Sequence, residues 1–568
     1  MQKKDIKPKK FTIKPIAYIV AATCAIATSS VQALDIRPAN GLGDFADGEH
    51  QFNDDKLNDN LTFYGDFSNK NNEFVIHTNT GNLQLKPDDK KKDRVLFVSN
   101  NSYFSSNKPI PKLTIEGGLT IDSYRSPSYQ TTIQADKYKN LSSWAVVQAG
   151  SGTNGAPYSE TTSGKIFIQG DLTINDVGRL DKDGKKIAYI GNAIYVGQES
   201  VIDLTKNDGT IGNVNISNSD FSGDVIDIGG SSYDSSAMGA EFTTGNINIS
   251  NTNGQHGIHV FGGTFKSDDI NITGGSYTHD LISFTGHKQG GDDNLKTNIT
   301  TNNINITNSS IKGSAIYVGT SGGQNSQTGT VNAQLGNITI DKVDAIVNDG
   351  QGFIHFNKNS NTNISLGDVK VTHSVIRKNV AHSGSSGIRF TENQSVSMTG
   401  NGEITFENIE MIQQGDPNYT GFWSDQISLV FLEHSVNNLN QVNITNLTND
   451  RTVQGSNPNT SPFMSALHIK FSGEQKIKNV SIDGVSTHDS GIVYGIYQNS
   501  NKNILSSDTI TIKNINGEND AYGLYLSGKA NVKQNLIVET VTGSKNTDRY
   551  ASQNLGPVGC ITNRFLIS

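Results

Sequence analysis

The chain has 568 residues, with 46 lysines and arginines against 54 aspartates and glutamates, which gives a formal net charge of −8. Loss of residues 1–33, predicted below to be cleaved, removes six lysines and Asp5, so that 40 basic and 53 acidic residues leave a net charge of −13. Such a chain is poorly suited to bind nucleic acid or an anionic membrane by charge. Only Cys24 and Cys560 are cysteines, so the mature chain has no internal disulfide to hold it together.

The N-terminus has the features of an export signal. Six lysines lie between Lys3 and Lys14, and the apolar stretch Ile16–Ile26 is too short to span a membrane. The residues Val31–Ala33 form a small-residue cleavage site, so residues 1–33 are predicted to be a signal peptide and the mature chain to begin near Leu34. Lipidation of Cys24 is an alternative, but the three residues before it match a lipoprotein signal poorly.

Residues 34–106 are less periodic than the rest of the mature chain. Leu61–Tyr64, Glu73–Ile76 and Val95–Val98 are strand-like segments within this region. We interpret residues 34–106 as a capping region, because the end of a solenoid exposes a sheet edge that must be covered.

The stretch Thr301–Thr320, TNNINITNSSIKGSAIYVGT, predicts two short strands joined by a polar turn. Ile304 and Ile306 alternate with polar residues, which is typical of a strand with one buried face, and Ile316 and Val318 do the same in the second strand. Two such strands cannot bury an apolar face alone, so copies of them must stack above and below.

The sequence supplies those copies at regular spacing. From one first strand to the next the steps are 33, 23, 34 and 34 residues. We interpret 23 residues as one complete coil and the longer steps as coils that carry a surface loop after the second strand. The first strands are Val214–Ile216, Ile247–Ile249, Ile270–Ile272, Ile304–Ile306 and Ile338–Ile340.

The pattern continues, more loosely, toward the C-terminus, and no amphipathic helix follows the signal peptide. Residues 107–541 are therefore predicted to form one all-β solenoid, with an irregular tail at residues 542–568. Asp183-Gly184, between Leu180 and Ile187, is typical of a hairpin turn and not of a calcium loop, which needs more oxygen ligands. Further strands are predicted at Val369–Val371, Ile404–Phe406, Val442–Ile444, Val480–Ile482, Ile510–Ile512, Ile388–Phe390, Leu467–Ile469, Val493–Ile496 and Leu524–Leu526.

Asparagine is frequent beside the first strands, as at Asn213, Asn246, Asn303 and Asn337. Asparagine can adopt left-handed backbone conformations at a corner, and its side chains can stack in hydrogen-bonded ladders from coil to coil. The alternative is that these asparagines are only solvated turn residues. Both interpretations are compatible with a solenoid.

The export signal, the cysteine-poor mature chain and several hundred residues of GNINI and GIxV-type repeats resemble the passenger region of a bacterial autotransporter, the type V secretion system. In repeat style and composition, the most similar members are adhesin-like and vacuolating-cytotoxin-like. The resemblance implies a right-handed parallel β-helix at the surface of a Gram-negative cell or released from it. It also implies a C-terminal membrane β-barrel, and nothing after Val541 has that pattern. We therefore expect a truncated product or a fragment, which would remain periplasmic if expressed alone.

The search for chemistry gives weak candidates. His488–Gly491 (HDSG) superficially resembles a serine-protease nucleophile site, but it lies in a predicted turn without a Gly-x-Ser context. His256, His259 and His279 lie near successive second strands and could form a metal site, although the interpretation as isolated surface histidines is favoured.

Carboxylates give a further candidate. Asp268, Asp269 and Asp280 could form the paired carboxylates of a polysaccharide-cleaving enzyme, although solvated turn residues are the favoured interpretation. Asn271 matches an extended bacterial glycosylation sequon but lies within a predicted strand. We assign no catalytic, cofactor-binding or metal-binding residue from the sequence.

Two functions from different classes remain. The first is a non-enzymatic adhesin-like or toxin-like surface protein whose β-helix presents loops to a receptor or glycan on a host or neighbouring cell, with self-association as a further option. The second is a secreted β-helical enzyme that degrades polysaccharide. The absence of a coherent acidic and basic cluster and the presence of only two tryptophans favour the first.

Overall fold

The chain divides into two compact units, residues 1–44 and 45–568, and every residue described below belongs to the second. The predicted signal peptide and its cleavage site therefore lie outside the described residues. The computed structural model describes residues 48–52, 56–57, 61–65, 73–86, 95–100, 110–126, 145–150, 163–180, 183–189, 191–197, 199–229, 239–286, 296–320, 330–348, 350–357, 362–379, 385–391, 395–414, 426–451, 463–488, 492–518, 520–543 and 551–552.

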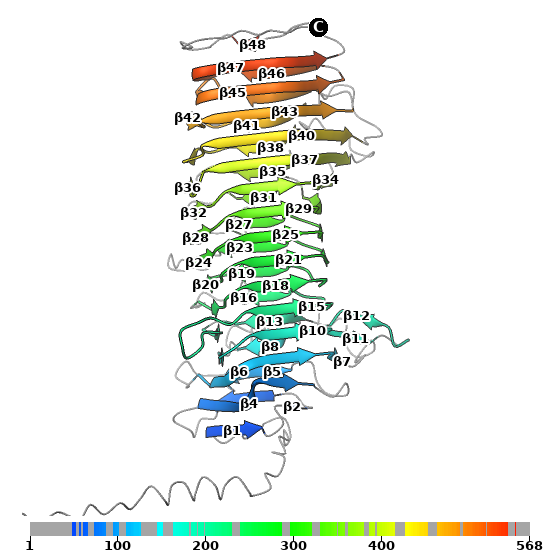
Figure 1. Ribbon diagram of the computed structural model, residues 1–568, viewed down its shortest axis with the longest axis vertical. Helices are drawn as coiled ribbons and strands as arrows, with labels where there is room; N and C mark the ends of the chain where they lie inside the picture. Colours follow the sequence, from blue (N-terminus) through cyan, green and yellow to red (C-terminus); the bar gives the residue numbers. More distant parts are fainter. Residues whose placement is uncertain are drawn as a thin grey trace, which may run out of the picture. The chain divides into compact units, whose positions relative to one another are not determined.

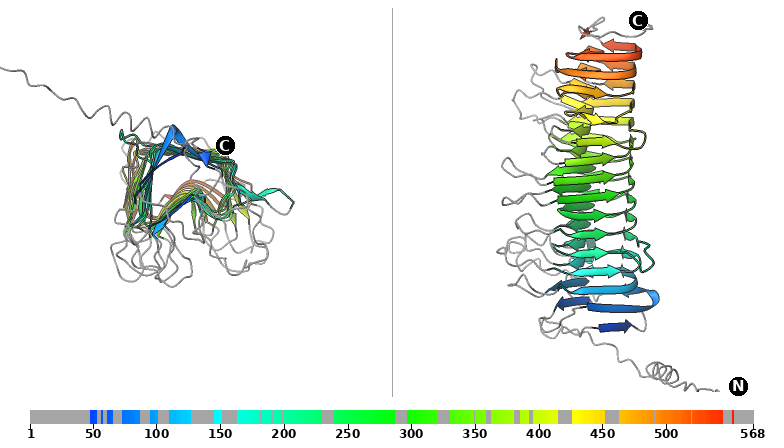
Figure 2. Two further views of the ribbon diagram at one scale, coloured as in Figure 1. Left: turned by 90° about the horizontal axis from the view of Figure 1, so that it is seen from below. Right: turned by 90° about the vertical axis from the view of Figure 1, so that its left-hand side faces the viewer.

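This unit is a parallel β-helix built from two long sheets, as the sequence predicts (Figure 1). We name the 30-stranded sheet A and the 15-stranded sheet B; every pairing within either of them is parallel. Seen along the stacking axis, the strands of successive coils lie one over another (Figure 2). Helices do not occur among the described residues, so none of these segments could cross a membrane as a helix.

Sheet B contains one strand from each coil. Its strands are β3 (Leu61–Gly65), β5 (Leu96–Asn100), β8 (Ala145–Ala149), β13 (Asn192–Val196), β16 (Ile226–Ile228), β19 (Ile258–Phe261), β23 (Ile282–Gly286), β27 (Ile316–Thr320), β31 (Gly352–Phe356), β35 (Ser385–Phe390), β38 (Gln426–Leu432), β41 (Phe463–Ile469), β44 (Ile492–Gln498), β46 (Asp520–Leu526) and β48 (Ala551–Ser552).

Sheet A contains the remaining coil strands, several of them two residues long. They are β1 (Gly48–Phe52), β2 (Lys56–Leu57), β4 (Glu73–Leu85), β6 (Lys112–Asp122), β9 (Lys165–Ile168), β10 (Leu172–Asn175), β14 (Val201–Asp203), β15 (Val214–Ser217), β17 (Glu241–Thr243), β18 (Ile247–Ser250), β20 (Gly263–Lys266), β21 (Ile270–Thr273), β22 (Ser276–Tyr277), β24 (Lys296–Thr301), β25 (Ile304–Thr307), β26 (Ser310–Ile311), β28 (Thr330–Leu335), β29 (Ile338–Asp341), β30 (Asp344–Val347), β32 (Thr362–Leu366), β33 (Val369–Thr372), β34 (Val375–Asn379), β36 (Ser395–Met398), β37 (Glu403–Gln414), β39 (Val436–Asn437), β40 (Gln441–Arg451), β42 (Gly473–Lys476), β43 (Asn479–Thr487), β45 (Asn503–Gly517) and β47 (Lys529–Gly543).

The predicted repeat register is confirmed. Strands β15, β18, β21, β25 and β29 pair in that order, so the 33, 23, 34 and 34-residue steps are steps from coil to coil. The 23 residues between Ile247 and Ile270 complete one coil. Ile304, Ile306 and the inward residues of β27 are fully buried, so the proposed interior columns are correct.

Each coil contains more strand segments than the two predicted. In the coil that begins at β24, the segments β24, β25 and β26 of sheet A precede β27 of sheet B. Strand β24 shows no alternation of apolar and polar residues in the sequence, because Thr297 and Thr301 occupy two of its three inward positions and only Ile299 is apolar. Strand β26 is hidden because two residues are too few to show a period.

One corner of sheet A is made by a left-handed residue in each coil. Asn218, Asn251 and Asn308 have φ values of 50°, 47° and 53°, each directly after the first strand of its coil. Asparagine tolerates this conformation better than other side chains. The corner role expected of asparagine is therefore correct, but it belongs to these residues; Asn213 instead accepts a hydrogen bond from the backbone N–H of Asn246 at 2.8 Å.

An asparagine ladder does run along sheet A, but it is made by residues within the first strands and not by the asparagines named from the sequence. The side-chain amide of Asn248 donates to Asn215 at 2.9 Å, Asn271 donates to Asn248 at 3.0 Å, and Asn305 donates to Asn271 at 2.9 Å. The two inner members, Asn248 and Asn271, each donate and accept one ladder bond, so the ladder joins four coils. Asn271, the residue of the sequon, is occupied in this ladder.

Strands within residues 34–106 pair with the coils that follow. Strand β1 pairs with β4, β4 with β6, and β3 with β5. The described strands of this region therefore already follow the parallel arrangement of the solenoid.

The hairpin predicted around Asp183-Gly184 is present. Strands β11 (Gly178–Leu180) and β12 (Lys186–Ile187) pair antiparallel in a third, three-stranded sheet with β7 (Arg125–Ser126). Gly184, at φ 76°, supplies the left-handed turn residue.

Candidate functional site

The outer face of sheet B is organised by a β-bulge. The backbone N–H groups of Gly257 and Ile258 both donate to the carbonyl oxygen of Leu281, at 2.8 and 3.0 Å, and the carbonyl of Val225 accepts two bonds in the same way. The extra residue interrupts strict alternation, so the outward side chains of a strand lie three positions apart. Each of these coils therefore presents a pair of outward positions.

These pairs bring histidines and aspartates from three coils together. Strands β16, β19 and β23 pair in register, so Asp227, His259 and Ser283 form one column. We call the group of Asp224, Asp227, His256, His259 and His279 the His–Asp cluster. Because successive coils are stacked, residues 23 to 35 positions apart become direct neighbours.

The contacts within the cluster centre on Asp224. Its carboxylate accepts from the backbone N–H of His256 at 3.0 Å and from Nδ1 of the same residue at 2.7 Å. Nδ1 of His259 lies 3.3 Å from Asp224 and 3.4 Å from Asp227. The rings of His256 and His259 stack at a centroid distance of 4.7 Å, and the ring of His279 is 5.2 Å from that of His256.

A buried amide fixes the two aspartates. The side-chain oxygen of Asn192 accepts from the backbone N–H of Asp224 at 2.8 Å, and its nitrogen donates to Asp227 at 3.3 Å. Asn192 is 1% exposed and lies on β13, one coil before the aspartates. The preceding coil therefore positions the carboxylates that the next coil uses.

Contacts within the cluster shift the pKa values of His259, Asp224 and Asp227 away from their usual values. Burial alone would lower the pKa of His259, but its bonds to Asp224 and Asp227 raise that pKa to about 10. Burial would raise the pKa of Asp224, but the bonds from His256 and His259 lower it. Burial, together with the negative charge of Asp224, raises the pKa of Asp227. An ionised Asp224 is thus paired with a protonated His259.

The same face is aromatic in the C-terminal coils. Tyr494 stacks on Tyr522 at 5.2 Å between ring centroids, and Tyr497 lies 5.3 Å from Tyr525. Strands β44 and β46 pair in register and hold these rings one coil apart. We call Tyr494, Tyr497, Tyr522 and Tyr525 the tyrosine ladder. Tyr497 and Tyr525 are partly exposed, so their rings remain accessible at the surface.

A charged group separates the two regions. Arg389 donates to Glu433 at 2.9 and 3.1 Å, and Lys470 lies 3.2 Å from the same carboxylate. Both cations lie over the ring of Phe431, at 5.2 and 5.7 Å from its centroid. His468 stacks on Phe431 at 4.5 Å and continues the aromatic column to Tyr497.

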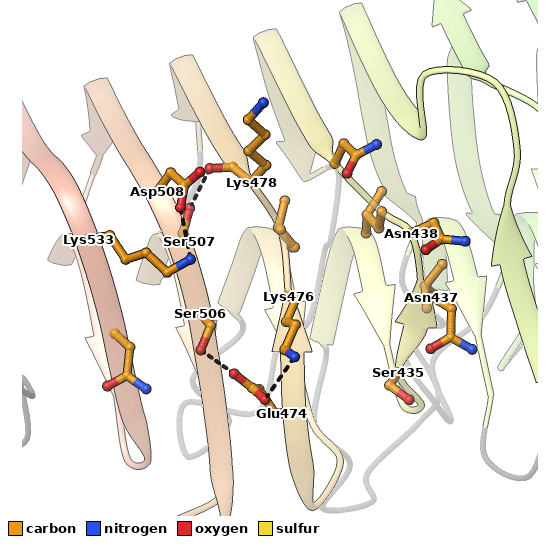
Figure 3. A pocket seen from close by; sticks show the side chains of 15 residues that line it. Ser435, Asn437, Asn438, Glu474, Lys476, Lys478, Ser506, Ser507, Asp508 and Lys533 are labelled. Carbon is orange, nitrogen blue, oxygen red and sulfur yellow. Dashed lines mark hydrogen bonds and ion pairs between the residues drawn. The ribbon is translucent and has the colours of Figure 1, made fainter.

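Sheet A carries a hollow of about 910 Å³ where β39, β42, β45 and β47 come together (Figure 3). In Figure 3 Lys533 and Asp508 point toward one another, and their ion pair measures 3.3 Å. Glu474 accepts from Ser506 at 2.6 Å and lies 3.7 Å from Lys476. Most charged side chains that line the hollow are therefore in the ion pairs Lys533–Asp508 and Lys476–Glu474, and neither positive nor negative charge predominates there.

The structure brings some of the candidate residues named from the sequence together and separates others. The structure brings His256, His259 and His279 together, so the interpretation as isolated histidines is wrong. Asp268 and Asp269 lie instead beside sheet A. Asp269 accepts from the backbone and side chain of Asn303, both at 3.0 Å, and Asp268 from Asn302 at 3.3 Å.

Asp280 lies apart from Asp268 and Asp269. It lies at sheet B, where it accepts from the backbone N–H of Ser314 at 2.6 Å. The three aspartates therefore do not make a common contact. Of the HDSG motif, His488 is described, and residues 489–491 lie outside the described residues.

Sequence reasoning missed Asp224, Asp227 and the tyrosine ladder. A signal was present: Asp-x-x-Asp at residues 224–227 and His-x-x-His at residues 256–259 recur at the same three-residue spacing, 32 positions apart. Tyr-x-x-Tyr at residues 494–497 and 522–525 follows the same rule. The spacing is meaningful only once the bulge of sheet B is known.

Comparisons with known proteins do not assign the chain to a family. No family model matches the chain, and no curated protein and no solved structure matches it.

Proposed function

We propose that the chain is an exported, passenger-type protein of a Gram-negative bacterium that binds a receptor or glycan on another cell and is not an enzyme. The observation that supports this best is the tyrosine ladder. Large aromatic side chains normally fill a core, yet these lie on the outer face of sheet B while β44 and β46 also bury apolar residues on their inner face.

Tyrosine is well suited to such a surface. Its ring offers apolar contact area, its hydroxyl group can bond to a polar partner, and only two side-chain torsions have to be fixed on binding. The rings repeat with the coil spacing, which suits an extended ligand that contacts several coils. The proposal therefore moves the binding function from the surface loops, as expected from the sequence, to the sheet face.

One observation favours the alternative, a polysaccharide-degrading enzyme. Asp224 and Asp227 are neighbouring carboxylates whose pKa values are shifted in opposite directions, as in an acid and base pair. However, both side chains are only 12% exposed, and both bond to His259. This leaves little carboxylate surface for a sugar chain, so we place the alternative second.

A binding experiment distinguishes the two. Labelled protein should bind to cells that display the receptor, and Tyr497→Ala with Tyr525→Ala should reduce binding about tenfold or more, since aromatic side chains dominate interface energies. Lys476→Ala with Lys533→Ala, in the hollow of sheet A, is the matched control and should bind as the parent does. Equal binding by both double variants would contradict the assigned surface.

The enzyme alternative has its own measurement. Release of reducing ends from a panel of polysaccharides, lost in Asp227→Asn, would replace the binding proposal with the enzyme. Export is tested separately: the N-terminal sequence of protein recovered from the periplasm or cell surface should begin at Leu34. A cytoplasmic protein that retains Met1 would remove the basis for the exported role.

A further inference from the structure

We propose that the His–Asp cluster is a zinc site that joins three successive coils. Asp224, His256 and His259 offer one ligand atom each, and these atoms all lie within 4.8 Å of one another. His279 provides a further imidazole from the next coil. The proposal does not depend on the binding function proposed above.

The ring positions fit a shared ion. Zinc bonds to imidazole nitrogen at about 2.0–2.1 Å, so the centroids of two imidazoles on one tetrahedral zinc ion lie about 5 Å apart. The observed separations are 4.7 Å for His256 and His259, and 5.2 Å for His256 and His279. The first two rings are nearly parallel, so binding would turn them toward a common point.

The donor atoms select the class of metal. Two or three imidazole nitrogens with one carboxylate suit zinc or another late first-row ion, whereas magnesium and calcium prefer oxygen ligands alone. The cluster is also accessible, since the side chains of His256 and His259 are 15% and 24% exposed. Nδ1 of His256 lies 2.7 Å and Nδ1 of His259 lies 3.3 Å from the Asp224 carboxylate, so these are the imidazole nitrogens that can share an ion with Asp224.

The surroundings provide the second shell that metal sites require. Asn192, itself 1% exposed, holds both Asp224 and Asp227. Asp227 in turn lies 3.4 Å from Nδ1 of His259 and so places a further carboxylate beside that ligand atom. The contacts of Asn192 hold the two aspartates in place before any ion arrives.

Metal binding must compete with protons. Histidine ligates only when the coordinating nitrogen has lost its proton, so zinc would replace the protons that now link the imidazoles to the carboxylates. Affinity for zinc should therefore rise with pH from 6 to 8.

The test is calorimetric titration of tag-free protein with ZnCl₂ at pH 7.5. We expect one zinc per chain, a loss of affinity of about 100-fold in the His256→Gln, His259→Gln double variant, and about tenfold in His279→Gln. Zinc should also raise the melting temperature of the parent protein, because ligand binding to the folded state stabilises it.

His373→Gln is the matched control. His373 forms a similar pair with Asp341, at 2.9 Å, but no second histidine ring contacts it among the described residues. This variant should retain the affinity of the parent. The proposal is overturned if the parent binds no stoichiometric zinc, or if His279→Gln and His373→Gln weaken binding equally. Should the double variant fail to fold, the comparison of His279→Gln with His373→Gln still decides the result.

Discussion

His259 and His355 occupy the same column of sheet B, three coils apart, and are held in opposite states. His259 faces two aspartates, and its pKa is raised to about 10. His355 is 3% exposed, lies against the ring of Tyr317, and has Arg389 on the adjacent strand. Burial, with the positive charge of Arg389, lowers its pKa to about 3. The same backbone position thus holds a cation in one coil and a neutral ring in another.

The inner columns behave differently. Ile270, Ile304 and Ile338 are register partners, and all three are buried isoleucines. Inner positions of stacked coils have to fill a shared apolar interior, whereas an outer position has only to satisfy its immediate neighbours. The inner columns therefore determine the fold, whereas the outer columns can hold side chains of different charge from one coil to the next.

The strongest test of this division is Ile306→Asp against Asn305→Asp in the same strand. Ile306 is fully buried, so the first change places an unpaired carboxylate in an apolar column and should cost about 4–5 kcal/mol of unfolding free energy. Asn305 faces outward, where the second change removes ladder bonds and should cost about 1–2 kcal/mol. Denaturant unfolding monitored by circular dichroism gives both values. Equal losses would mean that the assigned inner and outer faces are wrong.

The inner columns are also what the sequence predicts best. Ile304 and Ile306 show a period of two, and their copies fix the register of five coils without any structural information. Strand β24 was not predicted, since the inward Thr297 and Thr301 look polar although both are buried. Hydrophobic periodicity identifies only those strands whose inward residues are apolar.

The outer chemistry could not be predicted for a different reason. His256 and Asp224 meet only because the coil between them has a particular length, and their shared three-residue spacing indicates an outward pair only once the bulge of sheet B is known. The sequence therefore named three of the histidines but not the aspartates that hold them.

The final prediction uses pH to separate the two histidines. The folded-state pKa of His355 lies below that of the unfolded chain, so the unfolded state binds the proton first and stability falls as the pH drops from about 6.5 toward 3. Between pH 7 and pH 4 this amounts to about 3 kcal/mol. His355→Phe should therefore flatten the acid side of the stability profile, as followed by urea unfolding at several pH values.

His259 should act on the opposite side of the profile. Its folded-state pKa lies above the unfolded value, so its stabilising charge is fully present below about pH 6.5 and is lost as the pH rises toward 10. His259→Gln should flatten that alkaline slope by about 2 kcal/mol and leave the contribution of His355 on the acid side intact. The measurement needs a chelator, because bound zinc would also favour the folded state. If the two variants change the same side of the profile, the partners do not determine the charge of these histidines, and the contrast between the two regions fails.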